Sequence, residues 1–76
     1  MSQAQAIVHG LGGWGNIETL EACITRIRAQ VYDDALVNEK ELSKAGAFGV
    51  VAVSSAIQIV MGPESEKIVG EIKALR

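Results

Sequence analysis

A six-residue segment, Arg26–Val31, alternates strictly between polar and apolar side chains. Ile27, Ala29 and Val31 alternate with two arginines and a glutamine. Because successive side chains of a β-strand point to opposite sides, this period of two predicts a strand in a sheet with one buried and one solvated face. Any fold for this chain must therefore cover one side of a sheet and leave the other open to water.

Three further segments have the character of strands. Residues 49–53 and 56–61 are rich in Val and Ile and are joined by Ser54-Ser55, whose short polar side chains suit a tight turn, so they predict a hairpin. Residues 16–22 are a weaker strand candidate, because the spacing of Ile17 and Leu20 breaks the alternation and is also compatible with a helix.

Two capping boxes predict the starts of helices. Ser2 with Gln5 precedes an apolar stripe that is made of Ile7, Val8 and Leu11 and is ended by Gly12-Gly13. Asn38 with Glu41 precedes a two-turn helix through Ala45, stopped by Gly46.

A last helix is predicted from Gly62-Pro63 to the end of the chain. Acidic residues follow Pro63 at the positive end of the helix dipole, and Lys73 and Arg76 lie at the negative end. Its buried stripe is predicted to consist of Ile68, Val69, Ile72 and Leu75.

These elements predict a single α+β domain over residues 1–76, in the order α-β-β-α-β-β-α. Its simplest arrangement is a four-stranded antiparallel sheet covered on one face by helices. The core must be aliphatic, since apolar residues make up 49% of the chain but only three residues are aromatic. Of these, Trp14 is expected to anchor its glycine-flanked loop to the core, with a partner contact as the alternative.

Composition and charge exclude several classes of function. A net charge of −2 without a basic run disfavours nucleic acid as a partner. One cysteine cannot form an intramolecular disulfide, the N-terminal residues do not have the pattern of a signal peptide, and the apolar run 50–53 is far too short to span a bilayer, so we expect a cytoplasmic protein. His9 has no second metal ligand nearby, so no metal site is expected there, and no cofactor is predicted.

One segment is dense in reactive groups, the stretch 22–28 between the first two strands. The only thiol, Cys23, is followed there by Thr25, Arg26 and Arg28. Guanidinium charges and the amides of a turn favour a thiolate, which is the nucleophilic form of cysteine, and they also pair with phosphate oxygens. The same groups could therefore serve a nucleophilic thiol and a phosphoryl group bound to it.

Taken alone, these residue types leave other interpretations open. A lone cysteine is commonly a small buried hydrophobe, and arginines commonly solvate a sheet face. The segment is thus also compatible with a noncatalytic α+β regulatory or anion-binding module, in which Cys23 is incidental. A redox-sensing thiol is a third alternative, but without a second cysteine it would need another molecule to resolve its oxidised form.

Asn16-Ile17, followed after five residues by Cys23-Ile24-Thr25-Arg26-Ile27-Arg28, resembles the phosphorylation-site signature of the glucose-type enzyme IIB family of bacterial sugar phosphotransferase systems. The similarity continues through Gly46-Ala47 and the glycine-valine run after it, then Ile57-Gln58 and Gly62, and covers nearly the whole chain.

The resemblance implies a phosphotransferase component in which Cys23 accepts a phosphoryl group from a phosphohistidine of enzyme IIA. The group then passes to a sugar bound by the membrane-embedded enzyme IIC, and the chain reaches the inner face of the membrane only through that permease. Arg26 and Arg28 would be needed for transfer to the sugar. Ile24, Thr25 and Gln58 would lie around the phosphate.

Two positions depart from the family pattern. Trp14 stands where a polar residue is common, and Pro63 replaces the usual Ser or Thr cap. Neither lies in the signature, so they bear on helix starts and surface contacts. The family includes free-standing subunits and domains of longer permease chains, and the sugar is selected by the permease.

Overall fold

The computed structural model describes all residues from Met1 to Arg76 and confirms the predicted α+β fold and element order. Short 3-10 turns lie at Trp14–Asn16, Asp34–Leu36 and Gly62–Glu64. The main elements are α1 (Gln3–Gly10), β1 (Ile17–Cys23), β2 (Arg26–Val31), α2 (Glu39–Lys44), β3 (Gly49–Val53), β4 (Ala56–Val60) and α3 (Ser65–Ala74).

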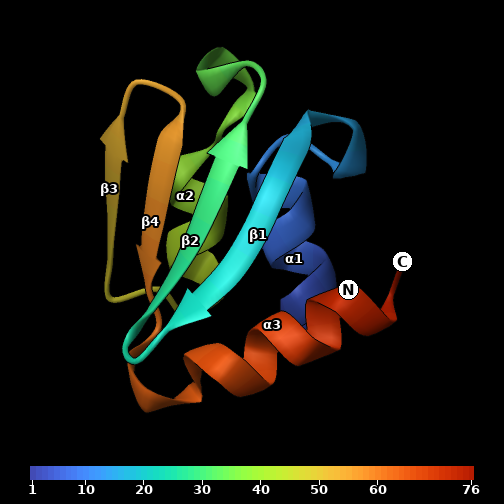
Figure 1. Cartoon of the computed structure of the whole chain (residues 1–76), viewed down its shortest axis with the longest axis vertical. Helices are drawn as coiled ribbons and strands as arrows, with labels where there is room; N and C mark the ends of the chain where they lie inside the picture. The colour runs from blue at the N-terminus through green and yellow to red at the C-terminus, as the bar shows by residue number, and fades with distance from the viewer.

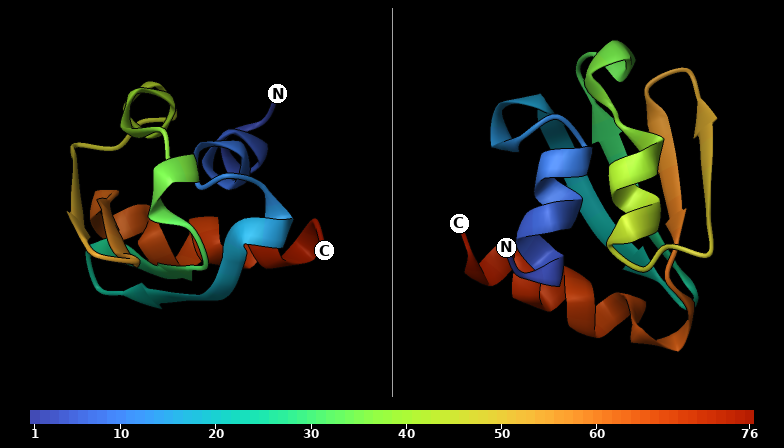
Figure 2. Two further views of the ribbon diagram at one scale, coloured as in Figure 1. Left: turned by 90° about the horizontal axis from the view of Figure 1, so that it is seen from above. Right: turned by 180° about the vertical axis from the view of Figure 1, so that it is seen from behind.

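The four strands form one antiparallel sheet in the order β1-β2-β4-β3. Each predicted hairpin is present, and β2 joins them by pairing with β4, which leaves β1 and β3 at the edges (Figure 1). All three helices lie on one side of the sheet, as the view from above shows (Figure 2). The other side is the open face on which the arginines of β2 lie.

The first capping box is confirmed, and the second is only half formed. Ser2 accepts from the amide of Gln5, and the side chain of Gln5 accepts from the amide of Ser2. At α2 the side chain of Asn38 accepts from the amide of Glu41, but the amide of Asn38 donates to the carbonyl of Gly10 instead. A contact between α1 and α2 has thus replaced the second half of the box.

The helical alternative for residues 16–22 is wrong, and the strand begins one residue later than predicted. Asn16 ends a 3-10 turn, and it is buried. Its side-chain amide nitrogen Nδ2 donates to the carbonyls of Leu11 and Asp33. The register of β1 against β2 shifts between Ile17 and Thr19, which marks a β-bulge. Because a bulge inserts one extra residue, it explains why the alternation predicted for this segment is broken.

The last helix also differs from the prediction at both ends. Gly62 and Pro63 form a 3-10 turn, and α3 begins at Ser65. Ile68 and Ile72 are buried as predicted, whereas Leu75 follows the end of the helix and is 44% exposed, so its assignment to the buried stripe is wrong.

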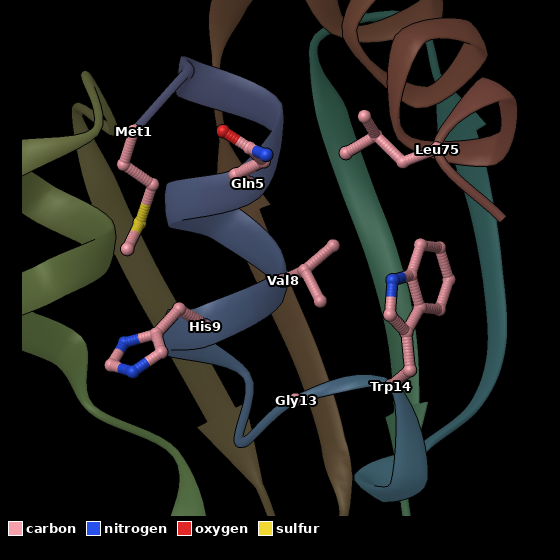
Figure 3. A pocket seen from close by; sticks show the side chains of 7 residues that line it. All are labelled: Met1, Gln5, Val8, His9, Gly13, Trp14 and Leu75. Atoms are coloured by element: carbon pink, nitrogen blue, oxygen red, sulfur yellow. The ribbon is translucent and has the colours of Figure 1, made fainter.

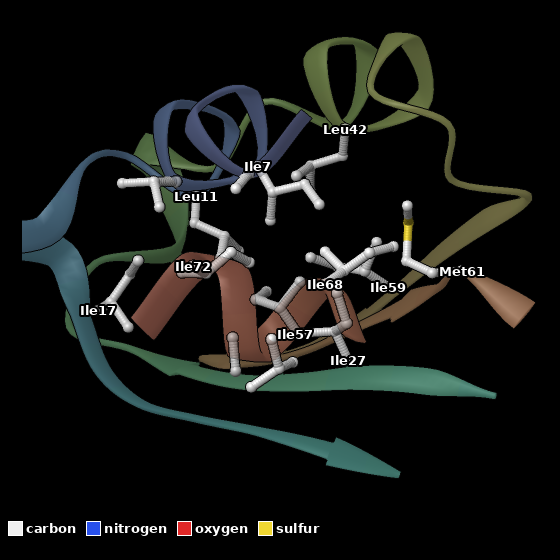
Figure 4. Packing of buried hydrophobic residues seen from close by; sticks show 14 of the residues in the cluster. Ile7, Leu11, Ile17, Ile27, Leu42, Ile57, Ile59, Met61, Ile68 and Ile72 are labelled. Carbon is white, nitrogen blue, oxygen red and sulfur yellow. The ribbon is translucent and has the colours of Figure 1, made fainter. Parts of the chain in front are cut away.

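Fifteen buried side chains, nearly all aliphatic, form the core between the sheet and the helices (Figure 4). Ile27, Ile57 and Ile59 line the inner face of the two central strands and are at most 1% exposed. Alternation then places the neighbours of these residues on the open face. Burial of the isoleucines of β2 and β4 therefore determines which way the polar side chains of those strands point.

Replacing Ile59 with alanine is expected to lower the free energy of unfolding by about 3 kcal/mol, because the side chain is fully buried and its loss leaves a cavity. Urea denaturation followed by circular dichroism measures the change. Val53→Ala is a matched control on an exposed position of β3 and should change stability by less than about 0.5 kcal/mol. Equal losses in the two variants would contradict the assignment of Ile59 to the core.

Candidate functional site

Cys23 and Arg26 face each other across the tight turn that joins β1 to β2. Cys23 ends β1, Arg26 begins β2, and the two are paired in the sheet register, so Ile24 and Thr25 are the only residues of the connection. Cys23 is an exposed free thiol. The side chain of Ile24 is 80% exposed beside it. The thiol is therefore open to a second protein, and the interpretation as a buried structural cysteine is wrong.

The sheet register gathers the predicted polar residues on the open face. Arg26 and Arg28 flank the buried Ile27, so both guanidiniums lie on the side away from the core. Gln58 lies opposite Arg28 on β4, and its Oε1 accepts a hydrogen bond of 2.7 Å from Nη1 of Arg26. Gln58 thus contacts one arginine directly and is the cross-strand neighbour of the other.

Backbone hydrogen bonds hold the turn itself. The carbonyl oxygen of Thr25 accepts from the amides of Met61 and Gly62, at 3.2 and 2.9 Å. The Thr25 side chain is exposed. The segment after β4 therefore fixes the backbone of the turn, while the side chains of Cys23, Ile24 and Thr25 remain accessible.

Glu21 is a charged neighbour of the site that the sequence analysis did not single out. It lies opposite Arg28 in the register of β1 and β2. Together with Thr19, Gln30 and Gln58 it lines a small depression of about 110 Å³ on the open face. The signal was present in the sequence, because Glu21 precedes Cys23 by two residues and must share its face of a strand.

A larger groove lies at the opposite end of β1 from Cys23, between α1 and the end of α3 (Figure 3). Trp14 is half-buried there and packs against the core, as expected for an anchor of the glycine-rich loop. The guanidinium of Arg76 lies 5.1 Å from the centre of its ring. His9, also at this groove, is exposed and contacts the carboxylate of Glu41. None of the predicted site residues lines the groove.

Nowhere in the chain do three or more His, Cys, Asp or Glu side chains gather in a way that could hold a metal ion. No helix combines the length and the apolar character that crossing a membrane requires.

Comparisons with known proteins point to one family. The family model described as "phosphotransferase system, EIIB" matches residues 5–38, which include the Cys23 turn and β2. The "PTS system N-acetylglucosamine-specific EIIB component" of Streptomyces coelicolor is 53% identical over 72 residues, which cover 95% of this chain and 94% of that protein.

Two other relatives are much longer. The "PTS system glucose-specific EIICBA component" of Staphylococcus carnosus and the "PTS system N-acetylglucosamine-specific EIICB component" of Bacillus subtilis are each 44% identical. The matches cover 82% and 90% of this chain but 9% and 15% of those proteins. Among solved structures, a domain of a PTS IIabc component from Clostridium difficile matches with a TM-score of 0.74 and 30% identity, over 95% of this chain and 73% of that one.

The chain therefore belongs to the EIIB family of the sugar phosphotransferase system, a family of phosphotransferase components. Within that family it is an EIIB domain of the glucose-type group, to which glucose-specific and N-acetylglucosamine-specific relatives belong.

Proposed function

We propose that Cys23 carries a phosphoryl group from a phosphohistidine of EIIA to a sugar bound by EIIC. The observation that carries this proposal is the placement of the only thiol of the chain, which is exposed at a tight turn beside two arginines of the same open face. Family membership supplies the class of reaction, and the geometry supplies a group that can perform it.

In the first step the thiolate of Cys23 attacks the phosphorus of the donor. An S–P bond forms as the P–N bond to the imidazole breaks, and the imidazole nitrogen keeps the electron pair. Such a transfer depends mainly on positioning and on stabilisation of charge over the phosphoryl oxygens. Exposure of Cys23 permits an in-line approach by a second protein.

In the second step a hydroxyl oxygen of the sugar attacks the same phosphorus. An O–P bond forms, the S–P bond breaks, and the hydroxyl proton leaves to a base or water on the acceptor side. Arg26 and Arg28 pair with the phosphoryl oxygens through their planar donor groups, and Gln58 holds the guanidinium of Arg26 in place. The turn residues Ile24 and Thr25 contribute to the backbone around the phosphate.

Both steps require partners that bind in turn at one surface. The names of the fused relatives join EIIB to EIIC, and in one case also to EIIA, which supports EIIA as donor and EIIC as acceptor for this chain. Contact with EIIC would bring the protein to the inner face of the membrane. Ile24 and Phe48, which are 80% and 81% exposed, offer apolar contacts for such transient partners.

Replacing Ile24 with aspartate is expected to raise the KM for phosphorylated EIIA by about tenfold, because an exposed apolar contact at the centre of an interface contributes strongly to binding. Initial rates at varied EIIA concentration measure it. Val53→Asp makes the same kind of change at an exposed apolar position at the other end of the open face and should leave the KM within about twofold. An unchanged KM for Ile24→Asp would exclude Ile24 from the EIIA interface.

The function itself is tested by intact-mass spectrometry after incubation with phosphoenolpyruvate, the general phosphotransferase proteins and a cognate EIIA. Gain of one phosphoryl group, mapped by fragmentation to Cys23, is the expected result. No gain in mass, with an EIIA shown to be phosphorylated, would overturn the carrier function and favour a noncatalytic anion-binding module.

A further inference from the structure

We propose that Gly62 is a positioning residue for the Cys23 turn, an inference that rests on the proposed role of that turn in phosphoryl transfer. The turn between β1 and β2 and the segment after β4 meet at one end of the sheet (Figure 1). At this junction the carbonyl oxygen of Thr25 accepts from the amides of Met61 and Gly62. Residues more than thirty positions apart in the chain thus hold the backbone beside Cys23.

The two hydrogen bonds orient the peptide group that joins Thr25 to Arg26. In a trans peptide the carbonyl and the amide point in opposite directions. Since the Thr25 carbonyl points toward the segment after β4, the Arg26 amide points to the opposite side, where β1 and Cys23 lie. Movement of Gly62 would therefore rotate the peptide that adjoins the reactive thiol.

The backbone of Gly62 is itself constrained. Its φ of 75° lies in the left-handed region, which glycine adopts readily and alanine does not. A Cβ at this position would lie 3.2 Å from Cε2 of Phe48. On the other side, the hydroxyl of the fully buried Ser65 donates to the Gly62 carbonyl at 2.8 Å. Ser65, Gly62 and Thr25 form a chain of hydrogen bonds that ends at the turn.

The positive φ and the contact with Phe48 explain why position 62 requires glycine and not another small residue. Any Cβ favours a change of φ at position 62, and that change moves the amide that donates to Thr25. Pro63 follows directly and restricts the conformation of the residue before it, so the segment has little freedom to compensate. Strain at Gly62 should therefore be relieved at the hydrogen bonds to Thr25.

The test compares Gly62→Ala with Gly13→Ala. Gly13 has a similar φ of 90°, a Cβ there meets no atom within 4 Å, and it lies in the loop at the opposite end of β1. Both variants place an alanine at a positive φ, but only Gly62 bonds to the Cys23 turn. We expect Gly62→Ala to lower the maximal rate of Cys23 phosphorylation by about tenfold at saturating EIIA, with the KM little changed. Gly13→Ala should stay near the wild-type rate.

Two further variants and a readout independent of EIIA sharpen the test. Ser65→Ala removes one bond of the chain and should cause a smaller loss, whereas Gly62→Asn should recover part of the rate, because asparagine tolerates the left-handed region better than alanine. The rate of Cys23 alkylation by iodoacetamide at one pH, and the amide NMR shifts of Ile24 and Arg26, should change in Gly62→Ala and not in Gly13→Ala.

Each pattern of results has one meaning. If the wild type accepts phosphate but both glycine variants behave alike in transfer, alkylation and NMR shifts, Gly62 does not position the turn. If the wild type accepts no phosphate at all, the proposed function fails, and the alkylation rates and shifts still decide whether Gly62 controls the geometry at Cys23.

Discussion

Cys23→Ser is expected to lower the rate of phosphate acceptance from EIIA at least a thousandfold. A serine hydroxyl is a far weaker nucleophile than a thiolate unless a base activates it. The only histidine of the chain, His9, is on α1 and contacts Glu41, so it cannot serve the turn. The substitution changes one exposed atom, so the fold and the partner surface should be retained.

Intact-mass spectrometry of the wild type and the variant under identical conditions measures this loss. Circular dichroism checks that the variant is folded. The affinity for unphosphorylated EIIA, measured by direct binding, checks that its partner surface is intact. A Cys23→Ser protein that gains phosphate as fast as the wild type, on any residue, would show that the carrier is not this thiol.

Arg28→Lys is expected to reduce transfer from phosphorylated Cys23 to the sugar by about a hundredfold, while acceptance of phosphate from EIIA changes by no more than a few-fold. Lysine retains the charge but lacks the planar pair of donors that binds two phosphoryl oxygens. Arg28 also lies between Glu21 and Gln58 in the sheet register, so its guanidinium has neighbours of defined geometry on both sides. Arg26→Lys should behave similarly and also lose the bond to Gln58.

A single-turnover experiment separates the two steps. Protein already phosphorylated on Cys23 is mixed with EIIC-containing membranes and sugar, and the rate of sugar phosphate formation is followed. Arg76→Lys is the matched control, since Arg76 is the third arginine of the chain and lies over Trp14, away from the site. Equal rates for Arg28→Lys and Arg76→Lys would exclude a role of the Arg28 guanidinium in onward transfer.

Local patterns in the sequence predicted most of the elements. The alternation at Arg26–Val31 placed three side chains in the core and both arginines on the open face, which the burial pattern confirms. The capping residues Ser2 and Asn38 located the starts of two helices. These features depend on residues within a few positions of one another, so neighbouring residue types are enough to specify them.

The predictions that were wrong depend on contacts between distant segments. The start of β1 is set by the buried side-chain amide of Asn16, which donates to the carbonyls of Leu11 and Asp33. Leu75 follows the end of α3 and is 44% exposed, where it lines the groove beside Val8 and Trp14. The amide of Asn38 is taken by the carbonyl of Gly10 on another helix.

Local sequence patterns are enough to specify the α+β class, the two hairpins, and the position of Cys23, Thr25, Arg26 and Arg28 around one turn. The pairing of β2 with β4 depends instead on contacts between distant segments. It brings Gln58 to Arg26, and the Thr25 carbonyl to the amides of Met61 and Gly62. A hairpin and its alternation arise from adjacent residues, whereas the choice between strands of two hairpins is made by the common burial of their apolar faces against the helices.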